Sequence, residues 1–402
     1  MRRFNKNGIV FVLALVFFGL GLTGCFQPLS EQAQWLWQGL REHRPGSVSW
    51  FISQVDAITT ERLAYHDLMM DVNSVRENLA GTRIVPKDDM TVVKADSGSL
   101  IAATEALDRE AVDPAADRIA TLRAVSEGYG ARFLYCAAPV KGCFESAPAN
   151  ADNGAGTSFA RYLEALAERE VPVLDLTGVL RETAGPEGAF FRTDHHWRPQ
   201  SAFHAVRAVC EALRDRYGFE SDEALLDLDR YQVTEYQDLF LGSYGKKVGR
   251  FFTWDGPDDF ALILPDFPTE LSVEQPAKEE VREGGFADTI IYSEFLQKDY
   301  YHRNPYAAYS GGDFRLQIVR NRLRPEGPKV LLVRDSFACA AAPFLALQCG
   351  ELHVCDVRDY EDFVGDKLNL EQYIASLRPD YVLVLYSGVS DMEHSSGRYD
   401  FF

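Results

Sequence analysis

Short apolar runs recur along the chain from residue 132 onward and alternate with stretches of helical periodicity. The runs lie at residues 132–139, 171–176, 329–336, 351–357 and 381–387. Apolar runs this short and continuous are typical of strands that are covered on both faces. The helical stretches between them lie at residues 158–170, 199–217, 337–349 and 370–377. The alternation predicts a mainly parallel sheet in a three-layer α/β fold.

Two other parts of the chain depart from this alternation. Residues 218–320 are rich in proline and acidic side chains and contain only short extended pieces, so we interpret them as an inserted lobe. Residues 30–79 have a helical pattern, whereas residues 83–94 predict a short extended pair around a polar turn. The predicted organisation is a mostly helical N-terminal region, residues 29–127, followed by the α/β domain, residues 128–402.

The N-terminus is predicted to be a targeting segment and not part of the fold. A basic start is followed by an apolar run from Ile9 to Leu22, which is the pattern of an export signal. The run ends in Leu-Thr-Gly-Cys and resembles a bacterial lipoprotein box, which would make Cys25 the lipidated first residue. The alternative is an uncleaved anchor, because residues 8–26 are long enough to span a bilayer. In either case we expect residues 1–28 to tether the body to the outer face of the cytoplasmic membrane, in the cell envelope.

Composition narrows the functional classes. The chain has 402 residues, of which 46% are hydrophobic and 25% charged, and this is a globular composition. Its formal net charge of -19 repels phosphate backbones and argues against nucleic acid as a partner. The cysteines other than Cys25 show no zinc spacing. Most are expected to be buried free thiols, although the 136–143 and 349–355 pairs are close enough in sequence for disulfides.

One candidate for chemistry is the serine at the end of the strand predicted at residues 329–336. Ligands bind at the carboxyl ends of strands in open α/β sheets. Ser336 would project into that crevice, and the N–H groups of a following helix would point at the same spot. This arrangement suits a nucleophile whose intermediate carries an oxyanion. The simpler interpretation is that Ser336 is an N-cap, as serines before helices often are.

A second candidate is the stretch FFRTDHHWRPQSAFH, which places an acid and two histidines on a loop entering a helix. Pro199 suits the first turn of that helix. Because side chains at i and i+2 share a side in extended backbone, Asp194 and His196 can face one crevice, with His195 turned away. An acid beside a histidine can fix its tautomer and stabilise the imidazolium, as serine catalysis requires. The alternatives are a metal site and a structural turn in which Trp197 supplies packing.

Neither a metal nor another cofactor is expected. The other histidines are scattered and no HExxH pattern occurs, so a metal at this loop would lack recognisable further ligands. The sequence also has no glycine-rich phosphate loop and no Rossmann fingerprint.

The segments RTDHHWRPQSA and VLLVRDSFACAAAPFLALQCGELHVCDVR together resemble the DHHW protein family of bacterial envelopes. More broadly, the chain looks like the SGNH-hydrolase-like proteins related to the periplasmic alginate O-acetyltransferases, with the likeness strongest at residues 132–387. The resemblance implies an SGNH-like fold and a catalytic triad of Asp194, His196 and Ser336. This order is permuted relative to ordinary SGNH esterases, in which the serine comes first, but geometry and not chain order defines a triad. The residues expected to surround and support the triad are His195, Trp197 and Asp335.

The chain departs from the SGNH pattern around the expected triad. Arg334 stands where a glycine usually precedes Asp-Ser, and Arg198 stands where a threonine or another cap is expected. No Gly-x-Asn-Asp block supplies the oxyanion asparagine. The best substitute is YSGGDF, with backbone N–H groups at Gly311 and Gly312 and with Tyr309 beside them. Turn formation is the simpler role for these glycines.

The resemblance implies an envelope-tethered enzyme that transfers an acyl group, in particular acetyl, to a cell-surface polysaccharide through an acyl-serine. Ser336 would attack the donor, His196 would accept its proton and Asp194 would orient His196. A membrane-bound O-acyltransferase is the implied partner, which would bring acetyl groups across the membrane. The alternatives are a plain esterase and a non-catalytic glycan-binding or assembly protein that keeps the fold.

Overall fold

The computed structural model describes residues 66–402, apart from residues 88, 185–187, 359–364 and 389–396. The chain divides into two compact units, Met1–Ala80 and Gly81–Phe402. In the first unit, the described part is the helix α3 (His66–Leu79), which belongs to the predicted helical region. The predicted targeting segment, Cys25 and the rest of the stretch before residue 66 lie outside the described residues. Among the helices that are described, none combines the length and the apolar character needed to cross a membrane.

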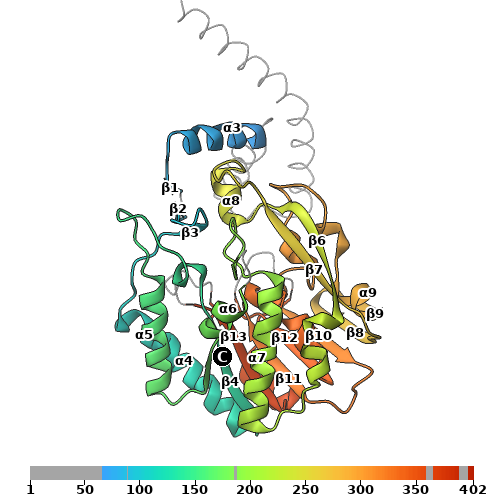
Figure 1. Ribbon diagram of the computed structural model, residues 1–402. Coiled ribbons are helices and arrows are strands. Elements are labelled where there is room, and N and C mark those ends of the chain that lie inside the picture. Colours follow the sequence, from blue (N-terminus) through green and yellow to red (C-terminus); the bar gives the residue numbers. More distant parts are fainter. Residues whose placement is uncertain (1–65, 88, 185–187, 359–364, 389–396) are drawn as a thin grey trace, which may run out of the picture. The chain divides into compact units, whose positions relative to one another are not determined.

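The second unit is built on an eight-stranded sheet with the strand order β5-β4-β13-β11-β12-β10-β8-β9 (Figure 1). The five parallel strands are β5 (Val173–Asp175), β4 (Arg132–Ala138), β13 (Tyr381–Ser387), β11 (Lys329–Arg334) and β12 (Glu351–Cys355). They coincide with the five apolar runs, so the predicted α/β fold with a mainly parallel sheet is confirmed. The antiparallel strands are β10 (Leu316–Asn321), β8 (Leu271–Gln275) and β9 (Glu280–Gly284).

Helices cover both faces of this sheet, as a three-layer fold requires. Successive side chains of a strand point to opposite faces, so Leu134 belongs to one core and Phe133 to the other. The core that contains Leu134 includes residues of α7 (Pro199–Tyr217) and α10 (Ala342–Ala346). The helices that contribute to the other core are α4 (Arg109–Gly128), α5 (Ala155–Glu168) and α11 (Leu370–Leu377).

Helix α7 begins and ends where the sequence predicts. Arg198 at its N-cap is extended, and Pro199 occupies the first turn, where a missing N–H costs nothing. Gly218 adopts a φ of 73°, the left-handed conformation that commonly ends a helix. A bridge between Phe190 and Trp197 closes the loop before the helix. The acid and the two histidines therefore lie on a short, closed loop.

The single helix expected at residues 337–349 is wrong. The structure has a 3-10 turn, η7 (Ser336–Cys339), followed by the five-residue helix α10. Pro343 explains the interruption, because it has no N–H to donate to a carbonyl one turn earlier and suits the first turn of a new helix. Ser336 nevertheless lies at the carboxyl end of β11, where the sequence places it.

Part of residues 218–320 extends the main sheet, since β8, β9 and β10 come from this stretch. The strands β6 (Tyr231–Phe240) and β7 (Asp258–Pro265) form a separate antiparallel pair, with a register shift between Tyr236 and Phe240. The remaining elements are α6 (Thr177–Thr183), α8 (Ser243–Val248), α9 (Phe286–Ile290) and the 3-10 helices η1 (Lys141–Cys143), η2 (Glu223–Leu226), η3 (Leu228–Arg230), η4 (Pro276–Lys278), η5 (Ser293–Phe295) and η6 (Pro305–Ala308).

A small antiparallel sheet precedes the α/β body. Its strands are β1 (Ile84–Pro86), β2 (Thr91–Lys94) and β3 (Leu100–Ala102). The first two form the extended pair that the sequence predicts. Val92 and Leu100 share a hydrophobic cluster with Val248 and Phe252, so this sheet is anchored to the chain around the end of α8.

The six cysteines within the described part of the chain are all free thiols. Five are buried and Cys143 is half-buried, which confirms the expectation for most of them. Burial raises the pKa of thiols such as Cys210, so they stay protonated and unreactive.

Candidate active site

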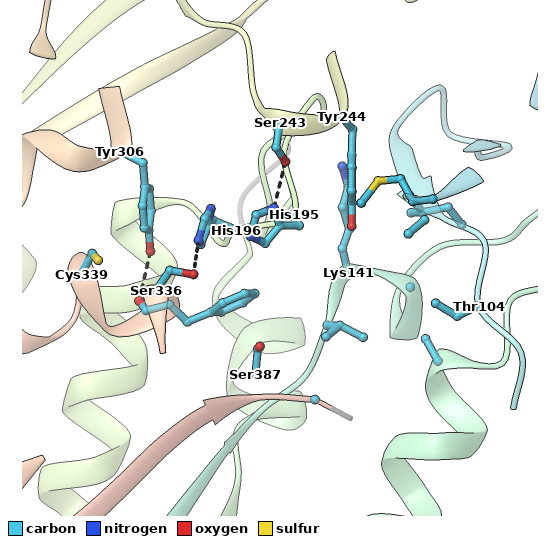
Figure 2. Close-up of a pocket in the computed structure, with 18 of the residues that line it drawn as sticks. Thr104, Lys141, His195, His196, Ser243, Tyr244, Tyr306, Ser336, Cys339 and Ser387 are labelled. Carbon is cyan, nitrogen blue, oxygen red and sulfur yellow. Dashed lines mark hydrogen bonds between the residues drawn. The ribbon is translucent and has the colours of Figure 1, made fainter. Parts of the chain in front are cut away.

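The carboxyl ends of three parallel strands open into a cavity of about 920 Å³ (Figure 2). The residues at or just after the ends of β4, β11 and β13 that line it include Val140, Ser336 and Ser387. Side chains from β3, α8 and η6 also take part in the lining. The cavity therefore lies where open α/β sheets bind their ligands.

Ser336, His196 and Asp194 form a continuous hydrogen-bonded chain at this cavity. The His196 Nε2 atom lies 2.8 Å from Ser336 Oγ, and its Nδ1 atom lies 2.6 Å from Asp194 Oδ1. Both distances fall within about 2.6 to 3.2 Å, the hydrogen-bond reach that proton transfer between such groups requires. Asp194 and His196 are buried, whereas Ser336 is only half-buried and lines the cavity. The acid lies behind the imidazole, and the serine faces the open space.

The Asp194 carboxylate is held by backbone donors as well as by the imidazole. Its Oδ1 accepts the His196 N–H at 2.9 Å, and its Oδ2 accepts the Ser243 N–H at 2.6 Å. Gly242 makes this second bond possible, because a side chain there would overlap the Asp194 backbone and Cβ. Burial opposes ionisation, but interactions with His195 and His196 and these hydrogen bonds hold the pKa of Asp194 well below its usual value.

His195 is placed differently from the sequence expectation. Its Nδ1 atom lies 2.9 Å from Ser243 Oγ, but it lines the same cavity as His196 and is not turned away from it. The two imidazole rings are 3.8 Å apart between centroids and tilted by 37°, because the loop bends here and is not extended. Burial and the neighbouring His196 lower the pKa of His195 to about 4, so it is neutral at pH 7.

Asp335 supports the serine, as expected, and also removes the simplest alternative role for it. It is Asp335 that occupies the N-cap of η7, so the Ser336 hydroxyl does not cap this turn. The Oδ2 oxygen of Asp335 accepts a hydrogen bond from the backbone N–H of Ser387 at 2.7 Å and another from its hydroxyl at 2.8 Å. Burial opposes ionisation, but the guanidinium groups of Arg398 and Arg358 lower the pKa of Asp335.

Aromatic side chains pack against the His196 ring. The Tyr306 ring stacks on it with centroids 4.2 Å apart and an interplanar angle of 18°. The Tyr306 hydroxyl and the Trp197 indole N–H both donate to the carbonyl of Phe337, at 3.0 and 2.9 Å. Trp197 is fully buried, as a packing residue should be. Tyr306 was not predicted, and no local sequence pattern points to it.

The segment YSGGDF does not have the role expected from the sequence. Tyr309 and Gly311 are not among the residues that line the cavity, and the Tyr309 hydroxyl bonds to the backbone of Ala261 and Ile263. Gly312 does line the cavity, but its carbonyl accepts hydrogen bonds from Arg334 at 3.3 Å and from the Cys339 thiol at 3.4 Å.

The buried Arg334 replaces the expected glycine and makes ion pairs with two carboxylates. It contacts Asp313 and lies 3.6 Å from an oxygen of Asp356. Arg358 joins the same carboxylates, so the network behind the serine turn has its charges paired. Gly312 and Asp313 of the YSGGDF segment thus help to hold the turn that carries Ser336.

Asp194, His195 and His196 are also a geometric candidate for a metal site, since one ligand atom from each lies within 4.8 Å of the others. The ligand atoms have other partners, however. Asp194 Oδ1 and His196 Nδ1 share a hydrogen bond of 2.6 Å, and His196 Nε2 faces Ser336. A metal would have to displace these bonds, so the donor set fits proton transfer better than metal binding.

Comparisons with known proteins agree with the resemblance stated from the motifs. Residues 99–238 match the family model described as the SGNH hydrolase-like domain of the acetyltransferase AlgX. This match includes Asp194 and His196, while Ser336 follows it. No protein with a curated description matches the chain.

Solved structures of other proteins share the fold, and two of them illustrate the similarity. A DHHW family protein from Eubacterium siraeum is 19% identical, with a TM-score of 0.58, over 79% of this chain and 96% of its own. Bacillus cereus PatB1, whose structure contains a sulfonyl adduct, is 18% identical, with a TM-score of 0.60, over 79% of this chain and 99% of its own. The resemblance to SGNH-hydrolase-like proteins is therefore confirmed at the level of the fold.

Proposed function

We propose that this chain is an SGNH-like O-acyltransferase that moves an acyl group, in particular acetyl, to a hydroxyl group through an acyl-Ser336 intermediate. The observation that carries the proposal is the position of His196, which contacts Asp194 with one ring nitrogen and Ser336 with the other at the edge of a cavity. The match of residues 99–238 to an acetyltransferase domain supports acyl chemistry.

In the first half-reaction, Ser336 Oγ attacks the acyl carbon of an ester donor and forms a new C–O bond. The hydroxyl proton passes to His196 Nε2, which lies 2.8 Å away. The bond between the acyl carbon and the donor oxygen then breaks, and His196 returns the proton to that oxygen. Asp194 keeps the Nδ1–H of the imidazole oriented and stabilises the imidazolium while it exists.

In the second half-reaction, an acceptor hydroxyl gives its proton to His196 Nε2 and bonds to the acyl carbon. The bond from Ser336 Oγ breaks, and Oγ takes the proton back from His196. Water in place of the acceptor gives hydrolysis, which is the esterase reaction. A cavity of about 920 Å³ leaves room for a sugar acceptor beside the serine.

The acceptor in this proposal is a cell-surface polysaccharide, and a membrane-bound O-acyltransferase supplies the acetyl donor. The chain works at the outer face of the cytoplasmic membrane, held by lipid on Cys25 or by an uncleaved anchor. The support for these points is the apolar segment at the N-terminus and the motif resemblance.

Phenylmethylsulfonyl fluoride tests the nucleophile. The expected result is a sulfonyl adduct on Ser336 in the native protein, located by peptide mass mapping, because His196 activates this hydroxyl. Ser336→Ala should give no adduct at this peptide, and His196→Ala should react far more slowly. Heat-unfolded wild type is the control for non-specific labelling. A folded wild type that forms no adduct contradicts the proposal.

A non-catalytic glycan-binding or assembly protein is the second candidate. It is favoured by the placement of Tyr309 and Gly311, which were expected to contribute to an oxyanion hole but do not line the cavity. This candidate predicts glycan binding without acyl-enzyme formation. A burst of p-nitrophenol from p-nitrophenyl acetate, matching the enzyme concentration, excludes it.

A further inference from the structure

We propose that Lys141 and Asp258 form a positioning pair that fixes the backbone of residues 191–194 and thereby sets the place of Asp194 in the triad. This inference rests on the proposed function, because it concerns how the acid is held for His196. The two side chains come from distant parts of the sequence, η1 and the start of β7.

Lys141 supplies the cationic half of the pair. It is 3% exposed, and its ammonium donates to the carbonyl oxygens of Phe191 at 2.6 Å, Arg192 at 2.7 Å and Asp194 at 3.1 Å. An ammonium has three donors, so these bonds use all of them. One of the carbonyls belongs to Asp194 itself, which ties the lysine directly to the residue that bears the carboxylate.

Asp258 supplies the anionic half. It is 1% exposed, and its Oδ1 accepts the Arg192 N–H at 2.7 Å. Its Oδ2 accepts the Thr193 N–H at 2.8 Å and the Thr193 hydroxyl at 2.5 Å. The cation therefore takes the carbonyls and the anion takes the amides of one short segment.

A lysine that binds the carbonyls and an aspartate that binds the amides suit a loop that lies outside helices and sheets. Its backbone groups need partners from elsewhere when they are buried, and charged partners give hydrogen bonds about twice as strong as neutral ones. The Gly245 N–H adds a bond of 2.9 Å to the Thr193 carbonyl, so successive peptide groups from Phe191 to Asp194 are fixed. Because the backbone is fixed, the position of the Asp194 carboxylate is fixed with it.

The charge of Lys141 is sensitive to pH near neutrality. Burial lowers the pKa of Lys141 to about 7, and the positive charge of Arg192 lowers it as well. The carboxylates of Asp258, Glu145 and Asp194 act in the opposite direction, because they favour the ammonium. Loss of a proton removes a donor from one of the three carbonyls. The pair then holds Asp194 less firmly, so reaction at Ser336 should decline above neutral pH through this group.

The experiment compares three full-length variants by kcat and KM for p-nitrophenyl acetate and by the rate of sulfonylation with phenylmethylsulfonyl fluoride. Lys141→Met should lower kcat and the sulfonylation rate about 10²-fold with little change in KM, because a displacement near 1 Å costs about that much. It should also lack the alkaline decline of wild type. Asp258→Asn keeps one carbonyl acceptor and should lose less. Lys246→Met is the matched control, since its ammonium donates to one carbonyl, that of Arg303 at 2.7 Å, and should leave both rates close to wild type.

A folded Lys141→Met protein with wild-type kcat and sulfonylation rate overturns the proposal. If that variant does not fold, Asp258→Asn decides through its rates and the low-field NMR resonance of the His196 Nδ1 proton. A shifted resonance with reduced rates supports the pair, and unchanged values overturn it. If wild type itself forms no Ser336 adduct, the proposed function fails, and the resonance alone still tests whether the pair positions the acid.

Discussion

The Oδ1 oxygen of Asp335 accepts a hydrogen bond from the backbone N–H of Phe337 at 3.0 Å, so the residue before the serine caps the turn after β11. A cap at Ser336 would direct its hydroxyl at the backbone. Because Asp335 takes that task, the serine hydroxyl is left to contact His196. The same carboxylate binds Ser387, so the serine turn is joined to the end of β13.

Asp335→Ala should destabilise the fold more than an ordinary cap deletion. It leaves the Phe337 and Ser387 amides without this acceptor, and it leaves Arg398, 3.4 Å from the carboxylate, without this counter-charge. Loss of a partner from a buried charge pair costs about 3 kcal/mol or more. Urea unfolding measures the difference, and Asp108→Ala, which removes the exposed N-cap of α4, is the control with an expected cost of about 1 kcal/mol. If both variants lose the same free energy of unfolding, Asp335 contributes no more to stability than an ordinary helix cap.

Ser336 and His196 should behave as one unit in kinetics. Each alanine variant should lower kcat for p-nitrophenyl acetate by about 10⁴-fold or more, because the nucleophile and its base act in the same step. The double variant should lose little beyond either single variant. Steady-state kinetics on all three proteins measures this coupling, and losses that multiply would show that the two side chains act independently.

His195 should make the stability of the fold depend on pH in the mildly acidic range. Its pKa is about 4 in the folded protein and 6.5 in its ordinary state. Between these values the unfolded chain binds more protons, so the free energy of unfolding rises with pH and falls as the solution is acidified. The effect is moderated because 38% of the side chain is exposed. Urea unfolding of wild type and His195→Gln between pH 4 and 6.5 should show a flatter dependence for the variant, and parallel curves would refute this role.

Tyr306 should affect the rate through its ring more than through its hydroxyl. Tyr306→Phe keeps the ring that stacks on His196 at 4.2 Å, whereas Tyr306→Ala removes it. An aromatic contact contributes about 0.5 to 1.5 kcal/mol, so the alanine variant should lose up to about tenfold in kcat. Its KM for p-nitrophenyl acetate should change little. The phenylalanine variant is the control and should stay close to wild type; equal losses would assign the effect to the hydroxyl.

Cys25→Ser should abolish incorporation of a labelled fatty acid in cells, if the lipoprotein box is processed. Membrane fractionation of the same cells separates the two tethers, because an uncleaved anchor keeps the variant in the membrane fraction without lipid. Wild type found as a soluble cytoplasmic protein would contradict both.

Local sequence patterns predict most of the strands of the sheet. They also predict one of the two contacts of the triad, that between Asp194 and His196. The run at 381–387 became β13, and α7 has the predicted bounds because Pro199 and Gly218 mark its ends. Asp194 and His196 are two residues apart, so their contact follows from local geometry. Ser336 is 140 residues further on, and only the shared motif resemblance linked it to them.

The parts that sequence could not predict depend on contacts between distant segments. Tyr306 reaches His196 from η6, and Asp258 reaches Thr193 from β7, and no spacing in the chain encodes either meeting. Tyr309 was expected near the oxyanion site because it is close to two glycines in the sequence. Its hydroxyl instead forms hydrogen bonds with the backbone of β7 and does not line the cavity. The single helix wrongly predicted at residues 337–349 is different, since Pro343, which begins a new helix there, is visible in the sequence.

Gly242 has a consequence for recognising inactive versions of this fold. Its backbone lies so close to Asp194 that any larger residue would push the acid away, and the neighbouring Ser243 N–H would lose its carboxylate partner. A chain could therefore retain the acid, the histidine and the serine and still have a misplaced triad if position 242 carries a side chain. The residue at this position can distinguish intact sites from decayed ones in genome sequences where the three reacting side chains alone cannot.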